Sequence, residues 1–253
     1  RPAVVVFPDC FTKLGGNQYI NSPGVGPWAD FIIQEAIPFI EERAPVSPGS
    51  DHRGVFGKSS GGYGAIIHGM RYADVWNAVA CHSGDMYFDF CYRTDFPNVL
   101  DTLAKHDRSI PEFIDYFHNA EKVSGDEFHA LMTIAMAATY DPNEEHPTDV
   151  RLPLDLYTGE LDHHRWDNWL RHDPIHVMDQ EGANLRELDL IYIDCGDQDQ
   201  YHMVYGHRIL HRKLDELDIN HIYEEFPDNH SKTDYRLDRS IPLLVDALVP
   251  FQD

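Results

Sequence analysis

Apolar residues along the chain fall into two patterns, short β-branched runs and longer segments whose apolar side chains recur every three or four residues. Segments of the second kind predict helices at residues 28–43, 59–73, 201–217 and 237–248. Strands that alternate with helices are typical of a mostly parallel sheet flanked by helices, so we expect an α/β fold. The runs that predict strands are "AVVVF" (3–7), "RGVFG" (53–57), "NAVAC" (77–81), "LDLIYIDCG" (188–196) and "NHIYEEF" (220–226).

The alternation stops between about residues 95 and 150. Three successive segments there have helical spacing, at residues 98–106, 110–123 and 125–140. We interpret this region as a helical insertion within a single domain of residues 1–253. It either covers a substrate site as a lid or packs against the rest of the domain, and periodicity favours neither alternative.

The segment "RGVFGKSSGGYGAIIHG" (53–69) contains two overlapping motifs. Its Gly-Lys-Ser would end a phosphate-binding loop, but that loop requires a glycine five residues earlier, where the chain has His52. The alternative, G-x-S-x-G, places Ser59 between a predicted strand and a predicted helix. This is the context of a nucleophile elbow, in which small residues on either side of the serine let strand and helix approach closely. Ser59 is therefore the candidate nucleophile, and the backbone N–H of Ser60 is a candidate oxyanion donor.

A serine nucleophile on such a sheet is followed along the chain by an acid and then by a histidine. The loop after the strand at 188–196 offers Asp197 and Asp199, which position alone does not separate, whereas Asp194 is expected inside the strand. His230 follows the last predicted strand, on a loop at the same carboxyl-terminal side of the sheet. This position distinguishes His230 from the other histidines of the chain and makes it the candidate general base.

Composition excludes some classes of partner. The net charge of −23 disfavours nucleic acids, whose phosphates would be repelled, and no apolar run approaches the roughly 20 residues that span a bilayer. We therefore expect neither a nucleic-acid nor a membrane partner. The adjacent pair at His163 and His164 has no clean ligand spacing, so we expect no metal.

The four cysteines form no C-x-x-C motif, and we interpret them as buried thiols of a reducing compartment, which favours the cytoplasm. A disulfide between Cys81 and Cys91 is the alternative.

At these residues the chain resembles a family of α/β-hydrolase esterases that includes the S-formylglutathione hydrolases (esterase D), enterochelin-esterase-like proteins and mycolyltransferases. "GKSSGGYGA" (57–65) resembles the family's elbow, and "HSGD" (82–85) its loop after the next strand. "FPDCFTKLGGNQYINSPGVGPW" (7–28) resembles its P-D-G loop with the aromatic-N-S segment that follows. "CGDQDQY" is similar to its acid loop, C-G-x-x-D-E-[FY], which assigns the acid to Asp199, and "EEFPDNHS" matches its histidine loop at His230.

The chain departs from the family pattern in two places. Gln200 replaces the acid that usually follows Asp199, and we expect the effect to be minor. The family's first strands and the loop that supplies the second oxyanion donor have no counterpart. In the family's sheet, the strand that bears this loop lies between the strands that residues 3–7 and 53–57 resemble. A gap at that place would leave backbone hydrogen-bonding groups unpaired. We expect a preceding segment or another polypeptide to fill the slot.

The resemblance implies a serine hydrolase that cleaves small-molecule esters or thioesters without a cofactor. Two alternatives stay open: an acyltransferase with the same three residues, and a non-catalytic binding protein on a decayed hydrolase fold. A homo-oligomer is compatible with the sequence. The candidate substrate contacts are Asn17, Gln18 and Tyr19 in the loop at 9–28, and His82, Asp85 and Met86 after a strand, where ordinary packing is the alternative.

Overall fold

The computed structural model describes residues 2–146 and 149–250, so residues 147–148 of the predicted insertion lie outside it. The chain divides into two compact units. Unit 1 consists of Arg1–Pro8, Phe31–Tyr87 and Asp173–Asp253, and unit 2 consists of Asp9–Asp30 and Phe88–His172. The predicted helical insertion falls in unit 2, which extends beyond it on both sides and includes the loop from residue 9.

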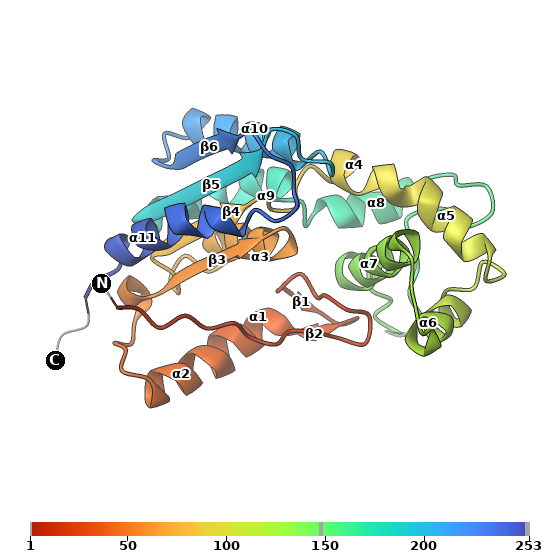
Figure 1. The fold of residues 1–253 in the computed structure, drawn as a ribbon, viewed down its shortest axis with the longest axis horizontal. Coiled ribbons are helices and arrows are strands. Elements are labelled where there is room, and N and C mark those ends of the chain that lie inside the picture. Colours follow the sequence, from red (N-terminus) through yellow and green to blue (C-terminus); the bar gives the residue numbers. More distant parts are fainter. Residues whose placement is uncertain (1, 147–148, 251–253) are drawn as a thin grey trace. The chain divides into compact units, whose positions relative to one another are not determined.

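Unit 1 is built on a parallel sheet of four strands in the order β3-β4-β5-β6 (Figure 1). The register pairs Val55 with Val79, Val79 with Ile191, and Ile193 with Tyr223. The sheet confirms four of the predicted strands and the α/β fold class. The strands are β3 (Gly54–Lys58), β4 (Ala78–His82), β5 (Leu190–Gly196) and β6 (Ile222–Phe226).

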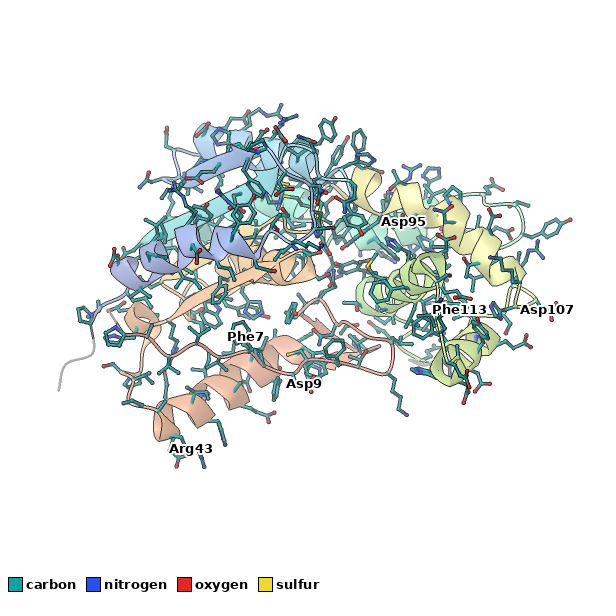
Figure 2. All side chains as sticks on the ribbon, in the orientation of Figure 1. Phe7, Asp9, Arg43, Asp95, Asp107 and Phe113 are labelled. Carbon is teal, nitrogen blue, oxygen red and sulfur yellow. The ribbon has the colours of Figure 1, made fainter. Side chains whose placement is uncertain are left out.

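The prediction of a strand at residues 3–7 is wrong. This segment forms no strand, and Val4, Val5 and Val6 are each about 44–45% exposed. Phe7, labelled in Figure 2, is 79% exposed and meets the ring of Phe56 edge-on at 6.3 Å between centroids. β-branched residues favour a strand only where a neighbouring strand completes the hydrogen-bond ladder, and within residues 2–146 and 149–250 none pairs with this segment.

Helices cover both faces of the sheet. α3 packs on β3 and β4, where an added Cβ at Gly69 would lie 2.9 Å from the Val79 side chain. The opposite face carries Ala78, Ala80 and Tyr192, which form a core with Leu244 of α11. The principal helices of unit 1 are α2 (Ile37–Arg43), α3 (Ser60–Arg71), α9 (Pro174–Glu181), α10 (Met203–Glu216) and α11 (Leu237–Ala247), with a π-helical turn at Phe31–Ala36 and 3₁₀ turns at Ser50–His52, Gly182–Glu187 and Asp234–Arg236.

Unit 2 is mainly helical, and its three longest helices confirm those predicted for the insertion. Helix α7 begins with a capping box in which Ser124 and Glu127 bond each other's backbone N–H groups. Helix α6 begins at the Ser109 cap with a proline in its first turn. The elements are β1 (Asn21–Ser22), β2 (Gly26–Pro27), α1 (Trp28–Asp30), α4 (Phe88–Cys91), a 3₁₀ turn at Arg93–Asp95, α5 (Phe96–Ala104), α6 (Ile110–Asn119), α7 (Gly125–Tyr140) and α8 (His163–Leu170).

All four cysteines are buried free thiols, so the alternative of a Cys81–Cys91 disulfide is wrong. Over the part of the chain that the structure describes, no helix has the length and apolar character needed to cross a bilayer.

Candidate active site

Ser59 occupies the sharp turn between β3 and α3. Its backbone has φ 58° and ψ −125°, a conformation that is rare for a residue with a side chain. The turn is held by three backbone hydrogen bonds: the N–H of Ser59 donates to the His82 carbonyl (2.9 Å), and the Ser59 carbonyl accepts from the N–H groups of Tyr63 (2.9 Å) and Asp85 (3.4 Å). Ser60 is the first residue of α3, where backbone N–H groups have no partner within the helix.

The close approach of strand and helix at this turn depends on particular glycines. A Cβ at Gly57 would lie 2.3 Å from the backbone of Gly61, and one at Gly62 would lie 2.8 Å from the His82 carbonyl oxygen. Gly61 is different, because a Cβ there meets nothing within 4 Å. The expectation that small residues are needed two positions before and two positions after the serine is therefore confirmed before the serine, at Gly57, and not after it, at Gly61. On the other side of the serine, the steric requirement falls on Gly62.

Asp199 and His230 form a buried pair on the loops that follow β5 and β6. Their separation is 2.7 Å between Asp199 Oδ2 and His230 Nδ1, and they are 5% and 7% exposed. Burial would raise the pKa of Asp199, but the hydrogen bond and charge of His230, with backbone N–H groups, outweigh it and hold that pKa below its usual value. Asp197 is exposed. The geometry thus pairs the histidine with the acid that the resemblance indicated.

The two loops that carry this pair are bound to each other. The Gln200 side-chain oxygen accepts from the backbone N–H of His230 (2.9 Å), and the N–H of Gln198 donates to the Asp228 carbonyl (3.0 Å). Gly196 permits this approach, because a Cβ there would lie 2.3 Å from the Asp228 carbonyl oxygen. This role of Gln200 was not predicted from the sequence. Its side-chain oxygen acts as a hydrogen-bond acceptor, which a carboxylate oxygen at this position could also do.

The Ser59 hydroxyl is directed toward Asp85. Ser59 Oγ donates to Asp85 Oδ1 at 3.4 Å, and Ser60 Oγ donates to Asp85 Oδ2 at 2.9 Å. Asp85 is 1% exposed, so both serines meet a buried carboxylate. Among the described residues, no hydrogen bond joins Ser59 Oγ to the His230 ring. Such bonds are often long or misaligned in enzymes without substrate.

A second Asp–His–Ser arrangement lies under the sheet. His82 Nδ1 is 2.7 Å from Asp194 Oδ1, and His82 Nε2 is 2.8 Å from Ser240 Oγ. Asp194 and Ser240 have no exposed surface, and Ser240 lies inside helix α11. No substrate carbonyl can reach that hydroxyl. Because both ring nitrogens of His82 are engaged in this network, the geometry favours packing over the substrate contact predicted for it.

Met86, another predicted substrate contact, is fully buried against Gly206 of α10. Nearby, His207 is also fully buried, with Nε2 3.1 Å from the Gly84 carbonyl oxygen. Burial lowers the pKa of His207 to about 4, so this ring is neutral at neutral pH. Both side chains contribute to packing beneath the loop that carries Asp85.

The remaining predicted contacts, Asn17, Gln18 and Tyr19, lie in unit 2. Gln18 is buried and donates to the hydroxyls of Tyr140 (2.9 Å) and Tyr92 (3.1 Å). The Asn17 side chain donates to the Cys10 carbonyl and accepts from the Tyr19 N–H. These bonds hold the loop within its own unit, and a substrate role for the three residues stays a prediction.

A strained serine between strand and helix, with an Asp–His pair on later loops of the same parallel sheet, defines the α/β-hydrolase class. A family model described as "Putative esterase" matches residues 17–238, so the chain belongs to this family.

Known proteins with similar sequence or structure carry esterase and hydrolase names. Esterase Rv1288 of Mycobacterium tuberculosis is 34% identical over 90 residues, which cover 33% of this chain and 19% of that protein. A ferulic acid esterase structure aligns with a TM-score of 0.53 and 18% identity over 91% of this chain and 64% of its own.

Two further solved structures share the fold. The fluorophosphonate-binding serine hydrolase FphF of Staphylococcus aureus aligns at TM-score 0.53 and 16% identity, over 90% of this chain and 68% of its own. MPT51 (FbpC1) of Mycobacterium tuberculosis aligns at 0.54 and 13%, over 92% and 74%. At these identities the likeness establishes the fold alone. The chain spans less than two thirds of the ferulic acid esterase and about a fifth of Esterase Rv1288.

Proposed function

We propose that this chain is a serine hydrolase that cleaves carboxylic esters or thioesters through an acyl-enzyme on Ser59. The observation that carries the proposal is the buried Asp199–His230 pair, at 2.7 Å, on two loops that end adjacent strands of the sheet bearing the Ser59 turn. The carboxyl ends of parallel strands lie on one side of a sheet, so the three residues all lie at the carboxyl-terminal side of the sheet of unit 1.

His230 is the general base and Asp199 its orienting acid. With Nδ1–H donated to Asp199, the Nε2 of a neutral imidazole holds a lone pair that accepts the Ser59 proton. Ser59 Oγ then attacks the acyl carbonyl, and the oxyanion accepts a hydrogen bond from the Ser60 N–H. The imidazolium returns its proton to the departing alcohol or thiol. Water, deprotonated by the same ring, then releases the acid and restores Ser59.

The bond between Ser59 and Asp85 belongs to the resting state in this proposal. A turn of the serine side chain moves Oγ–H from Asp85 toward His230, and Ser60 stays bonded to Asp85. Asp85 is therefore a positioning residue, which holds the start of α3 where its N–H groups can face the substrate. A buried carboxylate beside the nucleophile also disfavours anionic acyl groups, so we expect neutral acyl substrates.

The partner we propose is a small-molecule ester or thioester. The net charge of −23 argues against nucleic acids, and four buried free thiols support a reducing compartment such as the cytoplasm.

A matched pair of serine variants tests the proposal. Ser59→Ala should lower kcat on p-nitrophenyl acetate by about 10⁴-fold or more, because the nucleophile is lost. Ser240→Ala removes the hydroxyl of the buried second arrangement and should keep the activity at a temperature where it is folded. A fluorophosphonate probe should label wild type and Ser240→Ala but not Ser59→Ala. Normal turnover by Ser59→Ala would refute the proposal.

Product analysis with an added alcohol separates hydrolysis from acyl transfer. A hydrolase releases free acid at a rate that the alcohol leaves unchanged, whereas a transferase makes a new ester in its place.

A further inference from the structure

Two histidine rings and a carboxylate converge at a place that the proposed reaction does not use. His211 and Asp215 lie one turn apart on α10, and His221 immediately precedes β6. His211 Nδ1 is 2.7 Å from His221 Nε2. The two oxygens of Asp215 lie 3.6 Å from His211 Nε2 and 4.0 Å from His221 Nε2. We propose that His211, Asp215 and His221 form a binding site for a divalent transition metal, with Zn²⁺ as the best fit.

The hydrogen bonds of His221 prepare one ligand. Its Nδ1 lies 2.8 Å from the Ile219 carbonyl oxygen, which can only accept, so Nδ1 carries the proton. Nε2 of the neutral ring therefore holds a lone pair, and it faces His211 and Asp215. Metal-binding histidines commonly donate their other N–H to a backbone carbonyl, which fixes the tautomer and the orientation of the ring. The His221 side chain is only 4% exposed, so it has little freedom to turn away.

The second histidine is held in place by stacking. The His211 ring lies parallel to the Tyr223 ring, at 4.5 Å between centroids and 15° between planes. Zn–N bonds of about 2.0–2.1 Å in tetrahedral geometry place two ligand nitrogens about 3.3 Å apart. In the metal-free site the 2.7 Å contact is a hydrogen bond from His211 Nδ1–H to His221 Nε2, so the ion displaces this proton, which passes to His211 Nε2 as the ring changes tautomer. The rings must also separate by roughly 0.6 Å, a shift that sliding of His211 over Tyr223 allows. The Asp215 side chain is 62% exposed and can rotate to complete the set.

The chain between the ligands has a fixed turn. The N–H of Asp218 donates to the Asp215 carbonyl (3.0 Å), and the N–H of Ile219 donates to the Leu214 carbonyl (3.0 Å). Ile219 is itself buried, which anchors the end of the turn. The backbone that carries the three ligands is therefore ordered before any ion arrives, and binding requires only adjustments of the His211 ring and the Asp215 side chain. Two imidazoles, one carboxylate and water form a common ligand set for Zn²⁺.

This site lies at the opposite end of β6 from the catalytic loop. His221 precedes the amino end of the strand and His230 follows its carboxyl end, and a five-residue strand is about 17 Å long. The bound ion would join the end of α10 to the start of β6. We therefore expect it to stabilise unit 1 and to leave ester hydrolysis unchanged.

Metal-free protein, prepared by EDTA treatment and dialysis of the full chain, tests the site with ZnCl₂ and CoCl₂. Calorimetry should give one tight Zn²⁺ per chain, Co²⁺ should develop the visible bands of tetrahedral coordination, and Zn²⁺ should raise the Tm. His211→Gln combined with His221→Gln should lose all three responses. Asp215→Asn, at an exposed position that should not perturb folding, should weaken Zn²⁺ binding by about 10-fold or more.

The matched control is His163→Gln combined with His164→Gln. These two exposed histidines are neighbours in sequence at the start of α8. The variant removes two histidines but leaves the proposed ligands intact, so it should bind Zn²⁺ like wild type. Loss of the tight site in this control would overturn the proposal. So would a tight site that persists in the His211/His221 double variant, or the absence of any saturable binding by wild type.

Discussion

The backbone of Ser59 is strained, and a single neighbouring residue decides whether that strain can be accommodated. A φ of 58° with ψ −125° costs of the order of 1–3 kcal/mol for a residue with a side chain. Packing of β3 against α3 must offset this cost, and the packing is closest at Gly57, where a Cβ would meet the Gly61 backbone at 2.3 Å. The turn therefore depends on the absence of one methyl group.

This predicts opposite outcomes for two alanine substitutions in the same motif. Gly57→Ala should destabilise unit 1 by several kcal/mol and abolish esterase activity, because strand and helix must move apart. Gly61→Ala should preserve or slightly raise stability, because its Cβ has open space and alanine favours a helix. Urea unfolding of the two variants measures the difference. Equal destabilisation by both would contradict this account of the turn.

The candidate site was predictable from sequence only in part, for reasons that also operate at the scale of residues. Ser59 and His230 could be placed because a motif and the order of strands and loops are local properties. Asp199 could be separated from Asp197 only by the resemblance, since both lie on one loop. The contact of Asp85 with Ser59 joins residues 26 apart, and that of His82 with Ser240 joins residues 158 apart. No local pattern encodes such contacts.

At the scale of elements, the strands that were predicted correctly are those that pair with at least one neighbouring strand in the sheet. β4 is fully buried between β3 and β5, so its apolar sequence matches its buried position in the fold. The run at residues 3–7 is also apolar, but no strand among the described residues pairs with it. Helices α8 and α9 were missed although their starts have recognisable signals: the Asp162 and Asp173 side chains accept backbone N–H bonds, and Pro174 follows the second cap. Their few apolar residues weakened the periodic pattern.

The loops after β5 and β6 act as one element, and Gln200 joins them. The Gln200 side chain accepts from the His230 N–H and donates to the Ser231 hydroxyl (3.2 Å). We predict that Gln200→Ala lowers kcat/KM for p-nitrophenyl acetate by about 10-fold, because loss of the bond to His230, of about 1–1.5 kcal/mol, frees the His230 backbone. Gln200→Glu keeps an acceptor at the same place and should retain most of the activity. The pH profile of kcat/KM should shift little in Gln200→Ala, which changes no charge. An unchanged rate in Gln200→Ala would show that the histidine loop holds its position without this bond.

At the scale of the whole molecule, the sheet of unit 1 is asymmetric. β6 at one edge carries the histidine loop, whereas β3 at the other edge carries the nucleophile and has no further partner among the described residues. All residues of β3 are half-buried, while those of β4 are fully buried. The expected strand beside β3, contributed by a further segment or by another polypeptide, stays a prediction.

Hydrogen exchange of individual amides tests this prediction within one strand. The Ser59 N–H bonds the His82 carbonyl, so by the two-residue alternation of a strand the N–H groups of Val55 and Gly57 also face β4. Those of Phe56 and Lys58 then face the open edge and should exchange far faster than their neighbours in the chain at low concentration. Protection of Phe56 and Lys58 that grows with protein concentration would indicate a homo-oligomer formed through this edge. Strong protection at the lowest concentration would contradict an open edge, because it requires a partner strand from this chain itself.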